Sequence, residues 1–273
     1  MKISGRTQVL PKYSLYEALG VIKKCGFDGV EICLDNLHFE LKPDLLDDYV
    51  IRHNRERTLE LGLDPVSISF HADYVNNDFN FDSIKRAITK TRDYGTDILI
   101  ISNVWRRLDD SSQRERLVGR LKELTAVAEV YGIRLALEPE PGFLISSTED
   151  MQRLMDEVPS DSLACNLDLG HAFLCDEDPL VAIKSLGSKV VHCHIENMRR
   201  GIHQHLIPQE GDMDLSLYVK VLEEISFKGA MALDLAAYDY EMVAPEAVVF
   251  IKNLINNMWA GRMHPGLIKE SAI

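Results

Sequence analysis

Amphipathic helical segments and short apolar runs alternate along the whole chain. Apolar residues at positions i, i+3 and i+4 predict helices that bury one face, and the apolar runs between them predict strands. The predicted strands cover residues 2–4, 30–34, 66–70, 98–101, 135–137, 163–167, 190–195 and 231–233. The predicted helices cover residues 14–24, 44–61, 81–94, 111–131, 148–158, 179–186, 215–226 and 244–258.

Glycines stand shortly before five of the predicted strands, as Gly26, Gly62, Gly95, Gly132 and Gly229. Glycine is the residue that most readily closes a helix in the left-handed backbone conformation. The first four glycines lie 36, 33 and 37 residues apart, a length that suits one strand, one helix and two loops. The pattern therefore predicts a repeated strand and helix unit.

Eight such units predict a closed (β/α)8 barrel, the TIM-barrel fold. Strands that are apolar on both faces and alternate with helices are typical of a parallel sheet covered by helices. An open doubly wound sheet usually needs only about five or six strands, and no predicted strand is followed by the Gly-x-Gly-x-x-Gly motif of dinucleotide-binding folds. Because no linker or low-complexity tract interrupts the chain, we expect one TIM-barrel domain over residues 1–273.

Composition and charge narrow the choice of partners. The 273 residues include 43 acidic side chains against 30 lysines and arginines, which gives a formal net charge of −13 and an isoelectric point near 5.1. This charge repels phosphate backbones, so we expect no nucleic-acid partner. The sequence has no apolar window long enough for a bilayer and no secretory signal, so we expect a cytoplasmic protein without a membrane partner. The five cysteines lack Cys-x-x-Cys spacing and are expected to be reduced thiols, mostly in the core.

Carboxylates, imidazoles and one amide stand where the predicted strands end. The carboxyl ends of all the strands in a parallel barrel meet at one rim, where active sites are built. Carboxylates and imidazoles are the usual ligands of zinc, manganese and related divalent ions, so the sequence predicts a metal centre at this rim. The residues concerned are Glu31, His71, Asn103, Glu138, Asp168, His171, His192, His194 and Asp234.

Structural roles compete with metal binding for some of these residues. Glu138 ends a buried strand, where an unpaired carboxylate is costly, and this favours a functional role. Asp168 also suits the N-cap of the next helix. His192 and His194 lie on the same face of one strand, so one of them could be a core residue, and we prefer His194 as the ligand because it lies nearer the strand end. Asp234 could instead take part in a structural ion pair.

A long loop follows the seventh predicted strand and contains further candidates. His203 and His205 can present two imidazoles to one metal ion or to the substrate. Arg199 and Arg200 suit a substrate oxygen or phosphate, and a solvated loop charge is an almost equally good interpretation. Glu31 and Asn103, at the ends of the second and fourth strands, are expected to contact the substrate.

Four motifs in order resemble the xylose isomerase-like TIM-barrel superfamily, which includes sugar phosphate isomerases, epimerases and AP endonucleases of the endonuclease IV type. They are Leu-x-Leu-Glu-Pro, Asn-x-Asp-Leu-Gly-His, Val-His-x-His-Ile and His-Leu-x-Pro-x-Glu-Gly-Asp. The resemblance implies that Glu138, Asp168, His194 and Asp234 bind the metal. It also implies that His171 and either Arg199 or Arg200 contact sugar hydroxyls.

The chain departs from the pattern of the superfamily at three places. Asp234 stands where the epimerases usually place Glu, which shortens the carboxylate that would act as the second acid or base. In the nuclease branch a loop Asp-x-His binds a further zinc ion, and the matching residues here are His203 and His205. Asn103 stands where that branch has a zinc-binding His, so a trinuclear site is incomplete.

The sequence therefore predicts a divalent-metal-dependent isomerase or epimerase of a sugar, sugar phosphate or cyclitol. Proton transfer through a metal-stabilised enediolate would use Glu138 as the base and Asp234, or His71 through a water, on the other face. Nitrogen and carboxylate ligands favour Mn2+ or Zn2+, with Mg2+ or Co2+ as alternatives. A dehydratase acting on a keto-sugar or inosose is the alternative, followed by an AP endonuclease-like phosphodiesterase and a noncatalytic sugar-binding barrel. The superfamily also suggests a homodimer or homotetramer.

Overall fold

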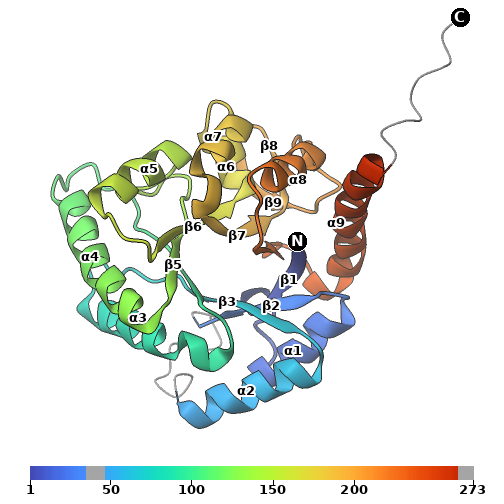
Figure 1. The fold of residues 1–273 in the computed structure, drawn as a ribbon, viewed down its shortest axis with the longest axis horizontal. Helices are drawn as coiled ribbons and strands as arrows, with labels where there is room; N and C mark the ends of the chain where they lie inside the picture. The colour runs from blue at the N-terminus through green and yellow to red at the C-terminus, as the bar shows by residue number, and fades with distance from the viewer. Residues whose placement is uncertain (35–46, 264–273) are drawn as a thin grey trace, which may run out of the picture.

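Eight parallel strands close into a barrel in the computed structural model, which describes the backbone of residues 1–34 and 47–263 and side chains up to residue 257 (Figure 1). The order around the barrel is β1, β10, β7, β6, β5, β4, β3 and β2, and every neighbouring pair is parallel. The strands are β1 (Lys2–Arg6), β2 (Gly29–Cys33), β3 (Asp64–Phe70), β4 (Ile98–Ile101), β5 (Arg134–Leu137), β6 (Leu163–Asp168), β7 (Val190–Ile195) and β10 (Ala230–Leu233). The predicted (β/α)8 barrel is thus confirmed.

Helices surround the barrel and connect successive strands (Figure 1). They are α1 (Leu15–Lys24), α2 (Asp48–Glu60), α3 (Asp78–Lys90), α4 (Gln113–Tyr131), α5 (Thr148–Glu157), α6 (Leu169–Cys175), α7 (Pro179–Leu186), α8 (Leu215–Glu224) and α9 (Tyr240–Met263). Short 3-10 turns add η1 (Thr7–Val9), η3 (Thr91–Tyr94) and η4 (Gly187–Lys189). The predicted N-terminal cap of the first helix is confirmed, because Ser14 and Glu17 form a capping box at the start of α1.

The predictions from the sequence misplaced the ends of some elements and missed others. β1 continues two residues beyond the predicted end, to Arg6, and α9 begins at Tyr240 instead of residue 244. The short helix α6 and an antiparallel hairpin of β8 (Asn197–Arg199) and β9 (Ile202–Leu206) were not predicted. Both are too short to show a clear period. The first residues of the helix predicted over 44–61 lie outside the described residues.

Four of the five predicted closing glycines have left-handed backbones. Gly26, Gly62, Gly95 and Gly132 have φ values of 89°, 63°, 100° and 63°, as expected for helix C-termini. The prediction for Gly229 was wrong, because Ser226 has the left-handed backbone at the end of α8, with φ 59°. Gly229 is needed for close packing instead, since a Cβ there would overlap the Val191 carbonyl oxygen.

The apolar core has two parts. A large cluster fills the space between the strands and the surrounding helices. A small cluster inside the barrel consists of Ile98, Ile100, Ala136, Ala164 and Val191, near the amino-terminal ends of the strands. These apolar side chains pack inside the barrel there, as in other TIM barrels, and polar side chains lie toward its carboxyl-terminal end.

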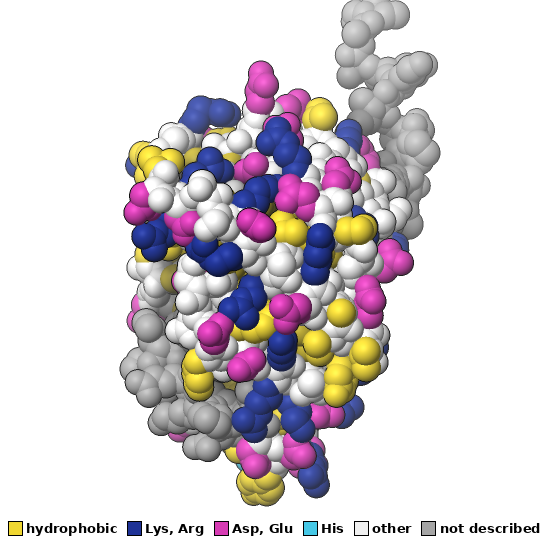
Figure 2. All heavy atoms as spheres, turned by 90° about the vertical axis from the view of Figure 1, so that its left-hand side faces the viewer, with side chains coloured by type: hydrophobic (Ala, Val, Ile, Leu, Met, Phe, Trp, Pro, Cys, Tyr) yellow, Lys and Arg dark blue, Asp and Glu magenta, His cyan; other side chains and the backbone are white. Residues whose placement is uncertain are grey.

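The outer face over α3, α4 and α5 carries interspersed acidic and basic side chains (Figure 2). Ion pairs join neighbouring helices here: Lys85 Nζ lies 3.3 Å from Glu123 Oε2, and Arg114 Nη2 lies 2.8 Å from Glu157 Oε1. Such exposed pairs contribute little to stability. Among the described helices, none has the length and apolar character required to cross a membrane.

Candidate metal centre

A hollow of about 730 Å3 opens at the carboxyl-terminal mouth of the barrel. This is the rim at which a TIM barrel places its reactive residues. Its lining includes Arg6 and six of the residues predicted from the sequence, namely His71, Asn103, Glu138, His171, His205 and Asp234.

Glu138, which lines this hollow, converges with the buried side chains of Asp168 and His194. One potential ligand atom from each lies within 4.8 Å of the others. His194 Nδ1 is 3.2 Å from Glu138 Oε1 and 4.0 Å from Asp168 Oδ2. Asp168 Oδ1 also accepts a hydrogen bond from His171 N and caps α6, as the alternative interpretation of Asp168 predicted. Two carboxylates and one imidazole fit a divalent cation of the zinc or manganese type.

Asp234, the fourth predicted ligand, is held differently. Its carboxylate forms a buried ion pair with Arg6, at the end of β1. Its Oδ2 atom is also 3.6 Å from His205 Nδ1, and Asp168, His205 and Asp234 form a second group whose ligand atoms lie within 4.8 Å of one another. Asp168 is therefore shared by both groups, and Asp234 combines an ion pair with a position beside the candidate metal site.

A buried hydrogen-bond network lies beneath these residues. His194 Nε2 is 3.0 Å from Glu31 Oε2, and Arg6 Nε donates to Glu31 Oε1 over 3.0 Å. Asn166 Nδ2 donates to Glu138 Oε2 over 3.1 Å. Glu31 is fully buried, so in this structure it supports His194 from below.

His192 is part of the same network and has no atom at the metal-binding group of Glu138. Its Nδ1 atom is 2.8 Å from Asn166 Oδ1, and its Nε2 atom is 3.2 Å from Ser67 Oγ. With Glu31 and His194, His192 forms another group whose ligand atoms lie within 4.8 Å of one another, so the preference for His194 as the ligand stays a prediction.

The pKa values of His192, His194 and Glu138 are set by burial and by the charges of neighbouring side chains. Burial and the Arg6 charge act to lower the pKa of His194, but Glu138 and Glu31 outweigh them and raise it to about 10. Burial lowers the pKa of His192 to about 3. Burial alone would raise the pKa of Glu138, but the His194, His71 and His171 imidazoles hold it well below its ordinary value. Glu138 is therefore ionised at neutral pH in the metal-free protein.

Two further carboxyl groups were not recognised from the sequence. Glu196 directly follows β7, is fully buried, and accepts a hydrogen bond from Gly170 N over 3.0 Å. Burial and the nearby Asp168 carboxylate raise its pKa well above the ordinary value. Glu140 lines the hollow, and burial together with Glu138 raises its pKa to about 8.

His171, His203 and His205 form a cluster of imidazoles at the rim. His171 Nδ1 is 3.0 Å from the Pro139 carbonyl oxygen, and its Nε2 atom is 3.0 Å from His203 Nε2. The His203 and His205 Nε2 atoms are 3.4 Å apart. The three predicted residues are thus brought together, and their ligand atoms lie within 4.8 Å of one another.

The remaining predicted residues lie at different places. His71 faces the hollow, with Nδ1 3.9 Å from Glu138 Oε2 and Nε2 3.5 Å from an Arg6 nitrogen. Asn103 lines the hollow, but its amide bonds the Glu138 and Ile145 backbones. Arg199 and Arg200 are exposed on the β8–β9 hairpin and are absent from the lining of the hollow.

An aromatic pair forms one side of the rim. Trp105 is 64% exposed, and its ring centroid lies 4.4 Å from that of Phe143. Both line the hollow, so the exposed Trp105 ring is available to an apolar face of a bound molecule.

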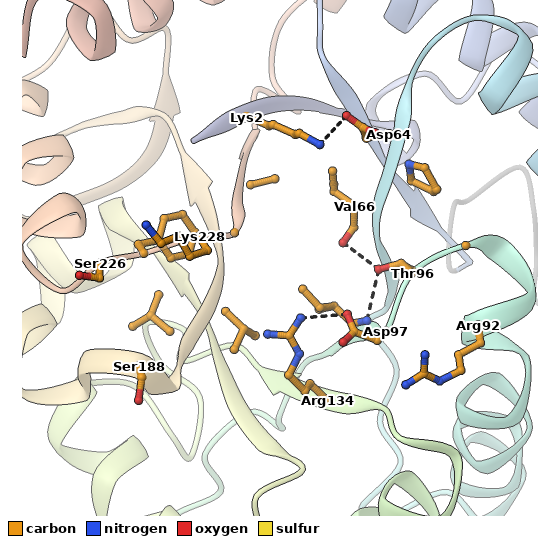
Figure 3. Close-up of a pocket in the computed structure, with 18 of the residues that line it drawn as sticks. Lys2, Asp64, Val66, Arg92, Thr96, Asp97, Arg134, Ser188, Ser226 and Lys228 are labelled. Atoms are coloured by element: carbon orange, nitrogen blue, oxygen red, sulfur yellow. Dashed lines mark hydrogen bonds and ion pairs between the residues drawn. The ribbon is translucent and has the colours of Figure 1, made fainter. Parts of the chain in front are cut away.

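A second hollow, of about 820 Å3, lies at the opposite end of the barrel (Figure 3). Its basic side chains include Lys2, whose Nζ is 2.6 Å from Asp64 Oδ2, and Arg134, whose Nη2 is 2.8 Å from Asp97 Oδ1. The converging carboxylates and imidazoles described above do not line it.

Arg6 and Glu196 are the main residues that the sequence analysis missed. The rule that selects polar residues at strand ends would have found Arg6 if β1 had been extended from Ser4 to Arg6. Glu196 lies one residue beyond the end of β7. It was passed over because His192 and His194 had already been chosen as the polar residues of this strand. Only the approach of α6 to β7 reveals that Glu196 is buried.

The chain is thus a closed parallel TIM barrel with a cluster of carboxylates and imidazoles at its carboxyl-terminal mouth. The chain belongs to the xylose isomerase-like TIM barrel family, whose model matches residues 19–254.

Curated relatives include both epimerases and dehydratases. The chain is 28% identical over 123 residues to fructoselysine 3-epimerase of Escherichia coli O157:H7, covering 44% of this chain and 45% of the relative. It is 24% identical over 131 residues to inosose dehydratase of Clostridium perfringens, covering 42% and 44%. The matched stretch thus spans less than half the length of each of these relatives.

A solved structure described as IolI protein with a bound zinc atom has the same fold. It matches with a TM-score of 0.75 and 20% identity, covering 97% of this chain and all of that chain. The zinc atom is named for that protein, and in this chain the groups of His, Glu and Asp described above are those that could hold a metal ion.

Proposed function

We propose that the protein is a divalent-metal-dependent isomerase or epimerase of a keto-sugar, sugar phosphate or cyclitol. The observation that carries the proposal is the convergence of Glu138, Asp168 and His194 beside an open hollow that Glu138 lines. An ionised carboxylate beside a cation site is what removal of a proton next to a carbonyl requires. Sugar-processing relatives of both the epimerase and dehydratase kinds support the substrate class.

Glu138, Asp168 and His194 would hold the ion, with Asp234 as the fourth ligand. Mn2+ or Zn2+ suits this donor set best, and Mg2+ or Co2+ is less well matched. When bound, the cation would polarise the substrate carbonyl and stabilise negative charge on the oxygens of an enediolate. Arg6 keeps the Asp234 carboxylate at the edge of this group through its ion pair.

Glu138 is the proposed base for the proton next to the carbonyl. The hydrogen bond from Asn166 and the contact with His194 fix its carboxylate. Fixed orientation matters because a base must lie within hydrogen-bond reach of the proton that it removes.

Asp234 or His71 would return the proton on the other face of the substrate. Both side chains line the hollow and both lie against Arg6. The ion pair with Arg6 engages the short Asp234 carboxylate, so His71, acting through a water, is the better placed of the two.

The rim would bind the rest of the substrate. Asn103 and His171 line the hollow, His203 lies against His171 over 3.0 Å, and Trp105 offers an aromatic face to the apolar side of a sugar. His203 and His205 are proposed to contact the substrate or to hold a further ion. Arg199 and Arg200 would reach a phosphate only after a change in the hairpin, and we assign Glu31 to the support of His194 instead of to substrate contact.

The test is hydrogen exchange in heavy water with Mn2+ present. A panel of ketoses, ketose phosphates and inososes is incubated with the protein, and we expect deuterium at one carbon of a substrate. Glu138→Gln should abolish the exchange and leave the fold intact, while Glu60→Gln, on the exposed surface of α2, should have no effect. Absence of exchange from every compound would refute the proposal.

The mass of the product distinguishes the dehydratase. The relationship to inosose dehydratase makes this the second candidate, in which the same enediolate loses a hydroxyl group as water. A product lighter by one water would establish it, and cleavage of an abasic-site oligonucleotide would instead indicate a nuclease.

A further inference from the structure

A further hollow of about 520 Å3 adjoins the hollow of the candidate metal centre. It lies between the loop after β1 and the segment that joins β10 to α9, and we call it the side hollow. The hollow that Glu138 lines is called the central hollow. Gln8, His205 and Asp234 line both hollows. Because β1 and β10 are parallel neighbours that end at the same rim, a molecule in the central hollow can extend directly into the side hollow.

The two hollows have different walls. The central hollow is lined by charged groups and imidazoles, among them Arg6, Glu138 and His71. The walls of the side hollow include five apolar or aromatic side chains: Val9, Leu10, Pro11, Ala236 and Tyr238. Such walls offer few partners to sugar hydroxyls, but burying a hydrocarbon group against them is favourable. The side hollow therefore suits an apolar group.

Hydrogen bonds fix both walls of the side hollow. On one wall, the hydroxyl group of Tyr240 donates to the Leu233 carbonyl oxygen over 3.0 Å. The other wall is joined to the first turn of α9, because the hydroxyl group of Tyr13 donates to Glu241 Oε1 over 2.8 Å and Lys12 Nζ lies 2.7 Å from the same oxygen. The side hollow is therefore preformed, which reduces the entropy lost when a ligand binds there.

The charges of the side hollow favour an uncharged occupant. Lys12 is the only lysine or arginine among the described residues that line it, and Lys12 is already paired with Glu241. The same lining contains the carboxylates of Asp234, Asp239 and Glu241. A phosphate group placed there would be repelled by these like charges.

The size of the central hollow shows that a simple sugar does not need the side hollow. Sites for small molecules typically have volumes of about 300–1,000 Å3. The central hollow, of about 730 Å3, already has such a volume by itself. The side hollow is thus additional space, with apolar walls, next to a site whose polar groups suit a sugar.

We propose that the substrate is a keto-sugar or cyclitol that carries a compact apolar substituent, such as an aromatic ring, and that this substituent binds in the side hollow. The sugar part lies in the central hollow, where the inference rests on the proposed function. Tyr238, which is partly exposed, offers its ring to the substituent. The apolar walls make the unsubstituted sugar and the sugar phosphate weaker ligands than the substituted sugar.

Binding of four probes to the Mn2+-loaded full chain tests this inference. The probes are D-fructose, D-fructose 6-phosphate, 1-O-benzyl-D-fructose and 6-O-benzyl-D-fructose, and titration calorimetry gives each dissociation constant. Burial of a phenyl group increases affinity by about 10- to 100-fold. We therefore expect at least one benzyl ether to bind about 10-fold more tightly than D-fructose or better. D-Fructose 6-phosphate should bind no more tightly than D-fructose.

A matched pair of variants locates the benzyl group. Ala236 and Ala237 are neighbouring exposed residues, but only Ala236 lines the side hollow. Ala236→Trp should fill the side hollow and reduce the affinity ratio of benzyl ether to D-fructose to about one, whereas Ala237→Trp should keep the ratio of the wild type. Tyr238→Ala should lower the ratio by removing one wall. Because both ligands are measured on the same variant, a general loss of binding does not change the ratio.

The aromatic pair on the other side of the mouth is the competing place for an apolar group. Trp105 and Phe143 line the central hollow, near the ends of β4 and β5, which lie across the barrel from β1 and β10. A ratio that falls in Trp105→Ala and stays unchanged in Ala236→Trp would place the substituent there and overturn the inference.

Three further results would also overturn the inference. They are benzyl ethers that bind no more tightly than D-fructose or do not bind at all, a preference that survives Ala236→Trp, and tighter binding of D-fructose 6-phosphate than of both ethers. Failure of the proposed function gives a different outcome, because these measurements need no turnover. A protein that prefers a benzyl ether but exchanges deuterium with no compound would refute the function and keep the side hollow as a binding site.

Discussion

The Nε2 atom of His194 lies 3.0 Å from Oε2 of Glu31, while its Nδ1 atom faces Glu138 at 3.2 Å. The imidazole is thus held from below by one carboxylate and turned toward the candidate metal site on its other side. A carboxylate on the second nitrogen of a ligating histidine fixes the orientation of the ring and increases its basicity. Arg6 in turn fixes Glu31, so the position of the ligand depends on β1, β2 and β7 together.

Glu31→Gln should weaken metal binding, although Glu31 is not one of the proposed ligands and acts through His194. Loss of an outer carboxylate partner typically reduces metal affinity by about 10- to 100-fold, and we expect that reduction here. Competition with a chelator of known affinity measures it, and Glu60→Gln provides the control with the same chemical change on the surface. An unchanged dissociation constant would show that Glu31 does not position His194.

Arg6→Met should strongly destabilise the metal-free protein near neutral pH. The change leaves the Glu31 and Asp234 carboxylates buried without their shared cation, and breaking a buried ion pair in this way costs about 3–5 kcal/mol. Urea unfolding measures the loss, and Arg6→Lys, which keeps a positive charge, should lose less. Equal stability of the two variants would contradict this account of Arg6.

In the metal-free protein, His192 and His194 should contribute to the pH dependence of stability with opposite signs, because their pKa values are shifted in opposite directions. The pKa of His192 falls to about 3 in the folded state, so the unfolded chain binds more protons below pH 6.5 and stability is lost as the pH falls toward 3. The pKa of His194 rises to about 10, so its contribution is present below pH 6.5 and is lost as the pH rises toward 10. Each contributes a slope of up to about 1.4 kcal/mol per pH unit.

Urea unfolding at pH 5, 6.5 and 8.5 in the presence of a chelator tests this pH dependence. His194→Gln should flatten the decline on the alkaline side. Stability that stays constant between pH 6.5 and 8.5 would show that the surrounding carboxylates do not raise the pKa of His194.

Ser226→Gly should stabilise the protein by about 1 kcal/mol. Ser226 has a φ of 59° at the end of α8, a conformation that costs L-residues about 1–2 kcal/mol and glycine little. Thermal unfolding measures the gain. Gly229→Ala is the contrasting change, because its Cβ would overlap the Val191 carbonyl oxygen, and it should destabilise. A Ser226→Gly variant that melts below the wild type would refute the strain argument.

The sequence by itself determined the order of the elements, the barrel and the residues at its rim. Apolar runs such as Ile98–Ile101 are read directly from the chain because burial on both faces of a strand leaves little choice of side chain. Glu138, Asp168 and His194 were found in the same way, since a polar group that ends such a run must lie at the mouth of the barrel.

Only the tertiary structure decided which partner each of these groups has. Asp234 pairs with Arg6, 228 residues away in the chain, and Glu196 is buried because α6 packs against β7. No local pattern encodes such pairings, because they depend on closure of the barrel, which brings its first and last strands into contact. Each strand of the sequence therefore reveals its own polar side chain. Closure of the barrel determines which of these side chains form ion pairs and hydrogen bonds with one another.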